Sequence, residues 1–333
     1  MAIFSYSHGY SRVLLDAPKN VHAWLQQHFS PFISPQEEFY PIVASTWKVV
    51  TDSHKLRDPQ RYVSSPPGEP EAVFLVDWSD KVICPIWPEE QYWVQQNCLR
   101  IIRALLKIEA ACNGEVFLHA GAMQVNNRWV LLLGPSRSGK TTLCAYSLLQ
   151  GGNFVGNDDI SIFASPNAHF LSARGWPRAI SVRLDSWKML NQNFYEVIES
   201  LRHPANGSLH RLVESGEEPH GTALLFPSEF AATFGGAKIQ KAVAVDALVF
   251  LQFGETTQLS SVPEPNIRES LLRMVRAHGV IYERFLECLV SDFQASEDVI
   301  NKLARLPAYD LQHIMGQSDI AYNLLKDVIR APT

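Results

Sequence analysis

One short segment constrains the fold of this 333-residue chain more than any other part of it. Residues 134–141 read Gly-Pro-Ser-Arg-Ser-Gly-Lys-Thr, which is the Walker A pattern of Gly, four residues, Gly-Lys and Ser or Thr. A chance match somewhere in the chain has odds on the order of 1 in 200. An apolar run, Trp129–Leu133, precedes the segment, and a helical pattern over Lys140–Leu149 follows it. The sequence therefore predicts a buried strand, a phosphate-binding loop and a helix in succession.

Each fixed position of this loop has a physical role. Gly134 and Gly139 allow backbone turns that a Cβ would obstruct, so that main-chain N–H groups can surround phosphate oxygens. The N-terminus of the following helix offers further N–H groups and partial positive charge to the same anion. Lys140 would meet the β- and γ-phosphates of ATP, and the Thr141 hydroxyl would bind Mg²⁺. The predicted nucleotide-binding residues are Gly134, Pro135, Ser136, Arg137, Ser138, Gly139, Lys140, Thr141 and Thr142.

Two adjacent carboxylates, Asp158 and Asp159, follow the short apolar run Phe154-Val155 beyond the predicted helix. In phosphoryl transfer one carboxylate can hold the metal ion that bridges the β- and γ-phosphates, and another can accept the proton of the attacking hydroxyl. Neighbouring side chains on an extended strand point to opposite sides, so the two would face one substrate only if the chain turns there. The alternative interpretation is an exposed acidic turn.

The stretch LHAGAMQVNNRWVLLLGPSRSGKTTLCAYSLLQGGNFVGNDDISI resembles the bacterial HPr kinase/phosphorylase group and its shorter relatives, among them the kinases found beside lasso-peptide precursors. The matching features are a Leu-His-Ala segment, a strand, the loop, a helix, a Gly and an Asp-Asp pair. The resemblance implies a phosphoenolpyruvate carboxykinase-like α/β fold with a P-loop core. It also implies ATP- and Mg²⁺-dependent phosphorylation of a hydroxyl, usually a serine of a peptide or protein, by a homo-oligomer.

The resemblance assigns roles to individual residues. Asp158 would be the general base and Asp159 a metal ligand beside Thr141, although a one-residue shift of the alignment would exchange the two. His119 precedes Lys140 at the interval of the family histidine, which lies near the reacting phosphate. From the residues alone, His119 ends an apolar run, where a lone histidine is more often a core residue than a catalytic one.

A phosphoryl-transfer site needs more positive charge than one lysine supplies. The segment SARGWPRAISVR contains Arg174, Arg178 and Arg183, and a Pro- and Arg-containing segment of the related kinases favours Arg178. The predicted catalytic residues are therefore Asp158, His119, Lys140 and Arg178, and the predicted metal ligands are Thr141 and Asp159.

Two departures separate this chain from the HPr kinases. Thr142 stands where they carry an acidic residue, and their Arg-Gly-Leu-Gly signature is not recognisable. Both departures argue against phosphorylase activity and against HPr as the acceptor. Two alternatives stay open: a kinase for a small molecule such as an amino acid or sugar alcohol, and a regulatory P-loop ATPase without a phosphoryl acceptor. The chain lacks the Asn-Lys-x-Asp and Leu-Ser-Gly-Gly-Gln motifs of GTPases and transporter ATPases.

Composition limits the surroundings and partners. Hydrophobic residues make up 46% and charged residues 19%, and the formal net charge is -5, so we expect a folded protein that does not bind nucleic acid. Five scattered cysteines without a Cys-x-x-Cys pair are typical of a reducing compartment. The segment MAIFSYSHGYSRVLL lacks the pattern of a signal peptide, and no long apolar window predicts a membrane span. We therefore expect a cytoplasmic enzyme.

Three regions are expected along the chain. Residues 1–112 would form a mixed α/β subdomain that ends in a helix from about residue 90 to 111, where apolar residues recur at helical spacing. Residues 113–265 would form the P-loop kinase core. Residues 266–333 would form a helical C-terminal region, in which Pro307 separates two helices capped by Ser296 and Ser318.

Overall fold

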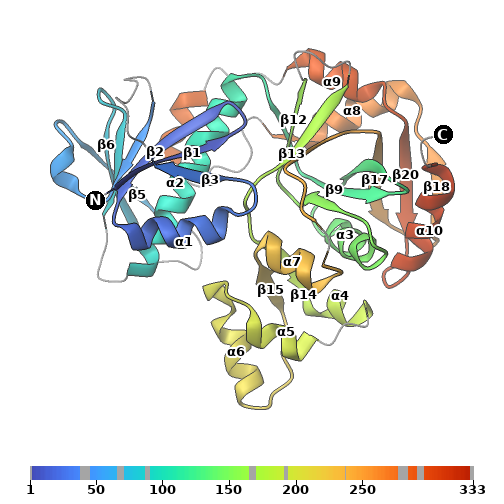
Figure 1. Ribbon diagram of the computed structural model, residues 1–333. Helices are drawn as coiled ribbons and strands as arrows, with labels where there is room; N and C mark the ends of the chain where they lie inside the picture. Colours follow the sequence, from blue (N-terminus) through green and yellow to red (C-terminus); the bar gives the residue numbers. More distant parts are fainter. Residues whose placement is uncertain are drawn as a thin grey trace. The chain divides into compact units, whose positions relative to one another are not determined.

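The computed structural model describes residues 2–37, 46–65, 71–86, 91–164, 170–190, 194–236, 238–276, 284–290 and 296–330. The chain forms two compact units. Unit 1 comprises residues 1–114 and 277–294, and unit 2 comprises residues 115–276 and 295–333. Both contain helices and sheets (Figure 1), so the fold is of the mixed α/β class.

Unit 1 is built on a seven-stranded sheet with the strand order β3-β1-β2-β4-β7-β6-β5. Its central pairs, β2 with β4 and β4 with β7, are parallel, whereas the outer pairs are antiparallel. Helix α2 packs against β2, β4 and β7 through a buried apolar stripe that includes Cys98, Ile101, Ile102 and Leu105. The elements are β1 (Ala2–His8), β2 (Ser11–Ala17), α1 (Lys19–Phe29), β3 (Ser34–Glu37), β4 (Lys48–Val50), η1 (Ser53–Lys55), β5 (Gln60–Ser64), β6 (Ala72–Asp77), β7 (Val82–Ile86), α2 (Gln91–Cys112) and η3 (Arg284–Val290).

Unit 2 contains a six-stranded sheet, β11-β9-β10-β17-β20-β18, and a five-stranded sheet, β16-β13-β12-β8-β19. In the first sheet β10, β17 and β20 run parallel, so their carboxyl ends meet at one edge. The strands are β8 (Val116–Leu118), β9 (Ala120–Val125), β10 (Arg128–Leu133), β11 (Phe154–Gly156), β12 (Ile160–Ala164), β13 (Leu171–Gly175), β16 (Ala242–Ala244), β17 (Ala247–Phe253), β18 (Gln258–Ser261), β19 (Val275–Arg276) and β20 (Ala308–His313).

Strand β10 shows why this part of the sequence is continuously apolar. Val130 and Leu132 belong to one hydrophobic cluster, and Leu131 and Leu133 to another on the opposite face of the sheet. Because successive side chains of a strand alternate between faces, a strand covered on both sides has no polar positions. Helices α3, α7 and α10 supply the first cluster, and the five-stranded sheet with α8 and α9 supplies the second.

A further two-stranded sheet, β14-β15, lies with helices α4 to α7 beside the main sheet of unit 2 (Figure 1). Its apolar residues join the same cluster as α3. The remaining elements are α3 (Lys140–Leu149), β14 (Ile180–Arg183), α4 (Leu184–Met189), α5 (Phe194–Ser200), η2 (Pro204–Asn206), α6 (Gly207–Glu214), β15 (Thr222–Leu225), α7 (Pro227–Thr233), α8 (Glu264–Met274), α9 (Glu297–Ala304) and α10 (Ser318–Val328).

The expected helical C-terminal region, residues 266–333, is not confirmed. Between α9 and α10 the chain forms β20, which pairs with β17 and β18. The segment 308–313 is short and rich in polar residues, so its apolar pattern did not reveal the strand. The helix caps differ as well: Ser296 accepts a hydrogen bond from the Val299 N–H as expected, but Ser318 is the first residue of α10, and Gln317 is its N-cap. The structure therefore groups the chain into two units rather than the three expected regions.

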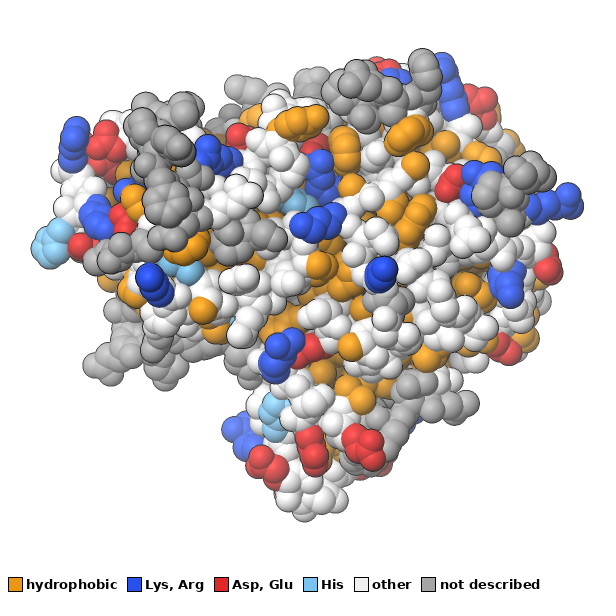
Figure 2. Space-filling model, in the orientation of Figure 1, with side chains coloured by type: hydrophobic (Ala, Val, Ile, Leu, Met, Phe, Trp, Pro, Cys, Tyr) orange, Lys and Arg blue, Asp and Glu red, His pale blue; other side chains and the backbone are white. Residues whose placement is uncertain are grey.

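The surface and the thiols agree with a globular chain. On the face shown in Figure 2, Lys and Arg side chains stand apart from one another and do not merge into one basic surface. All five cysteines are free thiols, and burial raises the pKa of Cys84 and of Cys98 to about 12. In the part of the chain that the structure describes, no helix is both long and apolar enough to cross a membrane.

Candidate active site

The Walker A segment forms a tight loop between β10 and α3, at the edge of the sheet where the parallel strands end. A Cβ added at Gly134 would lie 2.6 Å from the carbonyl oxygen of Leu251, and one at Gly139 would lie 2.6 Å from the ring of His313. Gly139 and Arg137 have φ values of 94° and 67°, in the left-handed region. Such turns direct successive backbone N–H groups to one side and form a concave site for an anion, which the N-terminus of α3 extends.

Lys140 begins α3 and is only 3% exposed. Its Nζ donates hydrogen bonds to the carbonyl oxygens of Gly134 and Pro135, both at 2.9 Å. The same nitrogen lies 4.0 Å from Oδ1 of Asp158. The lysine is thus held between the loop and a carboxylate, with its charge at the cavity that the loop lines.

The backbone turns at Asp158, between β11 and β12. Its φ of 63° is left-handed, which is uncommon for a residue other than glycine. Oδ1 lies 3.5 Å from Nε2 of His119, so the structure brings together three predicted catalytic residues, Asp158, His119 and Lys140. Asp158 lines the cavity, whereas Asp159 is 4% exposed and lies outside the cavity lining. The two carboxylates therefore do not face the cavity together.

A buried polar network holds the strand that follows these carboxylates. Glu115, which precedes β8, accepts hydrogen bonds from Ser161 of β12 and Arg174 of β13. The indole nitrogen of Trp176 donates to the Ser161 hydroxyl at 2.9 Å. Burial raises the pKa of Glu115 despite the neighbouring Arg174. Arg174 therefore has a structural partner and does not face the loop.

Asn157 is a site residue that the sequence interpretation missed. Its Nδ2 donates a 2.9 Å hydrogen bond to the hydroxyl of Thr141, the predicted metal ligand. Asn157 is 5% exposed, and among the described residues its Oδ1 has no hydrogen-bond partner. The only sequence signal was its position, directly before the acidic pair. The contact fixes the Thr141 hydroxyl at the first turn of α3.

His313 is a second residue that the sequence did not reveal. It ends β20, and its Nε2 lies 3.0 Å from the carbonyl oxygen of Ser138. A carbonyl only accepts, so Nε2 carries the proton. Because C=O and N–H of a trans peptide point in opposite directions, this bond turns the Gly139 N–H away from His313. The imidazole is 3% exposed, packs against Phe253 and also lines the cavity, and it thus supports the loop at Ser138.

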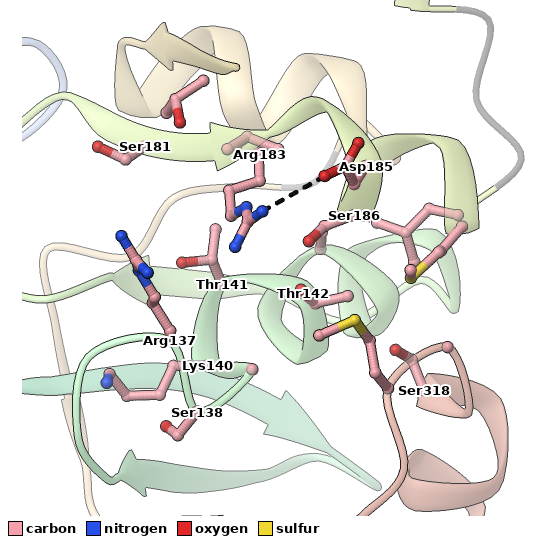
Figure 3. A pocket seen from close by; sticks show the side chains of 18 of the residues that line it. Arg137, Ser138, Lys140, Thr141, Thr142, Ser181, Arg183, Asp185, Ser186 and Ser318 are labelled. Atoms are coloured by element: carbon pink, nitrogen blue, oxygen red, sulfur yellow. Dashed lines mark hydrogen bonds and ion pairs between the residues drawn. The ribbon is translucent and has the colours of Figure 1, made fainter. Parts of the chain in front are cut away.

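Arginines approach the loop from two sides (Figure 3). Arg137 lies within the loop and Arg183 ends β14, and both line a cavity of about 780 Å³. Arg183 also pairs with Asp185 at 3.3 Å. Arg178, the favoured arginine, is partly buried and lies outside the lining of this cavity. Of Arg174, Arg178 and Arg183, only Arg183 lines this cavity.

The cavity lining includes most of the predicted nucleotide-binding residues. They are Ser136, Arg137, Ser138, Gly139, Lys140, Thr141 and Thr142. Gly134 and Pro135 take part through the carbonyl groups that hold Lys140. The Ser138 hydroxyl is buried and has no hydrogen-bond partner in the described part of the chain.

The oxygen atoms at the loop are suited to Mg²⁺ bound together with phosphate. The Thr141 hydroxyl and the Asp158 carboxylate both line the cavity. Within the described ranges, no group of three or more His, Cys, Asp or Glu side chains is placed to hold a metal ion by itself. Mg²⁺ commonly binds through one or two protein oxygens, water and substrate phosphates, so the donors fit such an ion.

Comparison with known proteins leaves the family open. No family model matches the sequence, and no curated protein matches it. Among solved structures, the chain is similar to the HPr(Ser) kinase/phosphatase from Coxiella burnetii, with 11% identity and a TM-score of 0.31, over 63% of this chain and 94% of that chain. A likeness at this TM-score does not show a shared function.

Proposed function

We propose that the chain is an ATP- and Mg²⁺-dependent kinase that transfers the γ-phosphoryl group to a hydroxyl. The observation that carries this proposal is the position of Asp158. Its carboxylate faces the cavity within 3.5 Å of His119 and 4.0 Å of the Walker A lysine, Lys140. A carboxylate beside the lysine that meets the γ-phosphate is suited to accept the proton of an attacking hydroxyl.

In the proposed reaction Asp158, His119 and Lys140 have separate roles. The acceptor oxygen attacks the γ-phosphorus, the bond to the β–γ bridging oxygen breaks, and ADP leaves with its electron pair. The acceptor proton moves to Asp158, and His119 holds that carboxylate in place. Lys140 and the loop N–H groups stabilise the charge on the transferred group. Mg²⁺, held through Thr141, water and the phosphates, would neutralise charge on the β- and γ-phosphates. Asp159, which lies outside the cavity lining, would act on this ion through water.

The acceptor proposed is a serine of a peptide or protein. The support is the sequence resemblance of residues 118–162 to kinases that phosphorylate serine. A small-molecule kinase would share the mechanism and differ only in the acceptor. A regulatory ATPase would use water as the acceptor and would have no need for a base beside an acceptor pocket.

The test is incubation with γ-labelled ATP, Mg²⁺ and serine peptides, free amino acids or sugar alcohols. Asp158→Asn should lower kcat by about 10²–10⁴-fold while ATP affinity stays close to that of the wild type. Lys140→Ala should weaken ATP binding and transfer together. Transfer by Asp158→Asn at the wild-type rate would refute the assignment of the base. Label found only as free phosphate, at a rate unaffected by every hydroxyl compound, would identify an ATPase.

Asp159→Asn is the matched variant for the second carboxylate. If Asp159 binds the metal, this variant should need more Mg²⁺ for half-maximal activity and should recover activity when Mg²⁺ is raised. Complete loss in Asp159→Asn at every Mg²⁺ concentration, with transfer retained in Asp158→Asn, would show that the two roles are exchanged.

A further inference from the structure

The cavity at the loop continues beyond the residues that the phosphate-transfer proposal uses. One end is polar and charged and contains Lys140 and Asp158. The lining also includes the apolar side chains of Met189, Leu190 and Met315, together with Asp185, Ser186, Gly316 and Ser318. In Figure 3, Lys140 and Arg137 lie on one side of Thr141, and Thr142, Ser186 and Ser318 lie on the other. The side of the cavity toward Ser318 thus adds large apolar side chains to its polar groups, and it is called the apolar end.

The apolar end carries two large side chains in contact with solvent. Met189 is 43% exposed and Met315 is 60% exposed. They belong to separate elements, the last turn of α4 and the connection from β20 to α10. A Cβ placed on Gly316 would lie 3.9 Å from the Met189 sulfur, so the two elements approach each other here. Exposed apolar side chains gathered in a groove mark a binding surface more often than scattered ones do.

The direction of a bound triphosphate follows from the loop. In this motif the lysine reaches the β- and γ-phosphates, and the backbone N–H groups cradle the α- and β-phosphates. Asp158 marks the reacting end because it faces Lys140. The α-phosphate consequently lies toward Thr142, and the nucleoside beyond it points to the end lined by Met189 and Met315.

We propose that Met189 and Met315 bind the aromatic base of the nucleotide, which rests on the proposed function and defines its nucleoside subsite. Thioethers are flexible and polarisable, and they make favourable contacts with aromatic rings. The hydroxyl acceptor then enters from the opposite end, beside Asp158 and His119.

The experiment compares ATP with inorganic tripolyphosphate, which has the same phosphates and no base. Binding of both is measured by calorimetry with Mg²⁺ for the full chain and for Met189→Ala/Met315→Ala. The expected result is an ATP dissociation constant raised about tenfold in the double variant and an unchanged tripolyphosphate dissociation constant. Leu272→Ala is the control, because Leu272 is an apolar residue of α8 with a similar exposure of 46% and lies outside the cavity lining.

Two outcomes would overturn the proposal and leave the kinase proposal standing. The first is an unchanged ATP affinity in the double variant. The second is a raised KM for the hydroxyl acceptor with ATP affinity unchanged, which would assign this end to the acceptor. Failure of the proposed function gives a different result, because label from γ-labelled ATP would then appear only as free phosphate, whatever the ATP affinity of the double variant is.

Discussion

The shape of the phosphate-binding loop depends on a residue far away in the sequence. His313 is 175 residues from Ser138, whose carbonyl it binds. The parallel order β10-β17-β20 places the end of β20 next to the loop. Without the imidazole, the Ser138 carbonyl would lose its donor and the peptide that orients the Gly139 N–H would be free to turn.

His313→Ala should therefore weaken ATP binding. Loss of a hydrogen bond to a buried carbonyl costs about 1–3 kcal/mol, and part of this cost falls on the loop conformation that binds phosphate. We expect an ATP dissociation constant raised about tenfold by calorimetry. His313→Gln keeps an N–H donor of similar reach and should retain most of the affinity. An alanine variant that binds ATP like the wild type would show that the loop holds its shape without this support.

Local sequence was enough to predict some of these residues and not others. Lys140 and Thr141 belong to a contiguous motif, whereas the roles of Asp158 and His119 were implied by the family resemblance. Asn157 and His313 act through contacts that depend on a side-chain rotation and on sheet order, neither of which a motif encodes. The choice of Arg178 over Arg183 depended on where a turn would direct each guanidinium, which spacing alone cannot decide.

At the level of elements, the strand–loop–helix unit was predictable because each part has its own signal. Strand β10 is apolar on both faces, the loop has its glycines, and α3 is amphipathic. Strand β20 had no such signal, because half of its side chains are only partly buried and its place in the sheet is set by β17 and β18. The loop is thus encoded locally, but the edge of the sheet that supports it is encoded by long-range pairing.

Alanine variants of two glycines at opposite ends of α3 should distinguish the effect of backbone strain from the effect on the phosphate-binding loop. Gly139 and Gly151 have φ values of 94° and 80°, so alanine at either position should cost about 1–2 kcal/mol of unfolding free energy. A Cβ at Gly151 meets nothing within 4 Å, whereas one at Gly139 would lie 2.6 Å from the ring of His313. Gly139→Ala should therefore also abolish ATP binding, and Gly151→Ala should not.

Urea unfolding and ATP titration of both glycine variants check this prediction. A loss of stability in both variants, larger in Gly139→Ala because of the contact with His313, together with a loss of binding in Gly139→Ala alone would agree with it. Normal ATP affinity in Gly139→Ala would mean that the loop tolerates displacement of His313, and the support assigned to this histidine would be wrong.

At the scale of the whole molecule, the two units have separate means of stabilisation. Unit 2 contains the loop and the cavity, so a bound nucleotide should stabilise this unit in proportion to the logarithm of its concentration. Unit 1 contains Asp77, a buried carboxylate that accepts hydrogen bonds from backbone N–H groups, among them those of Arg57, Asp58 and Asp80. Calorimetry with and without ATP should accordingly distinguish two transitions, of which ATP raises only one.

Asp77 should make the unfolding of unit 1 sensitive to acid. The backbone hydrogen bonds, first that from Asp80, lower the pKa of Asp77 below its ordinary value. A carboxyl whose pKa is lowered in the folded state contributes stability that is complete above its unfolded pKa, about 3.9. This stability is lost as the pH falls through the folded pKa.

Asp77→Asn replaces one acceptor oxygen with an NH₂ group. It should lower the free energy of unfolding of unit 1 at pH 7 by about 1–3 kcal/mol. The difference from the wild type should shrink as the pH falls below about 3.9, where the carboxyl is protonated in the unfolded chain, and should vanish once the folded carboxyl is protonated as well. If Asp77→Asn lowered the ATP-responsive transition by the same amount, the two units would unfold together, and the separate stabilisation inferred for them would be wrong.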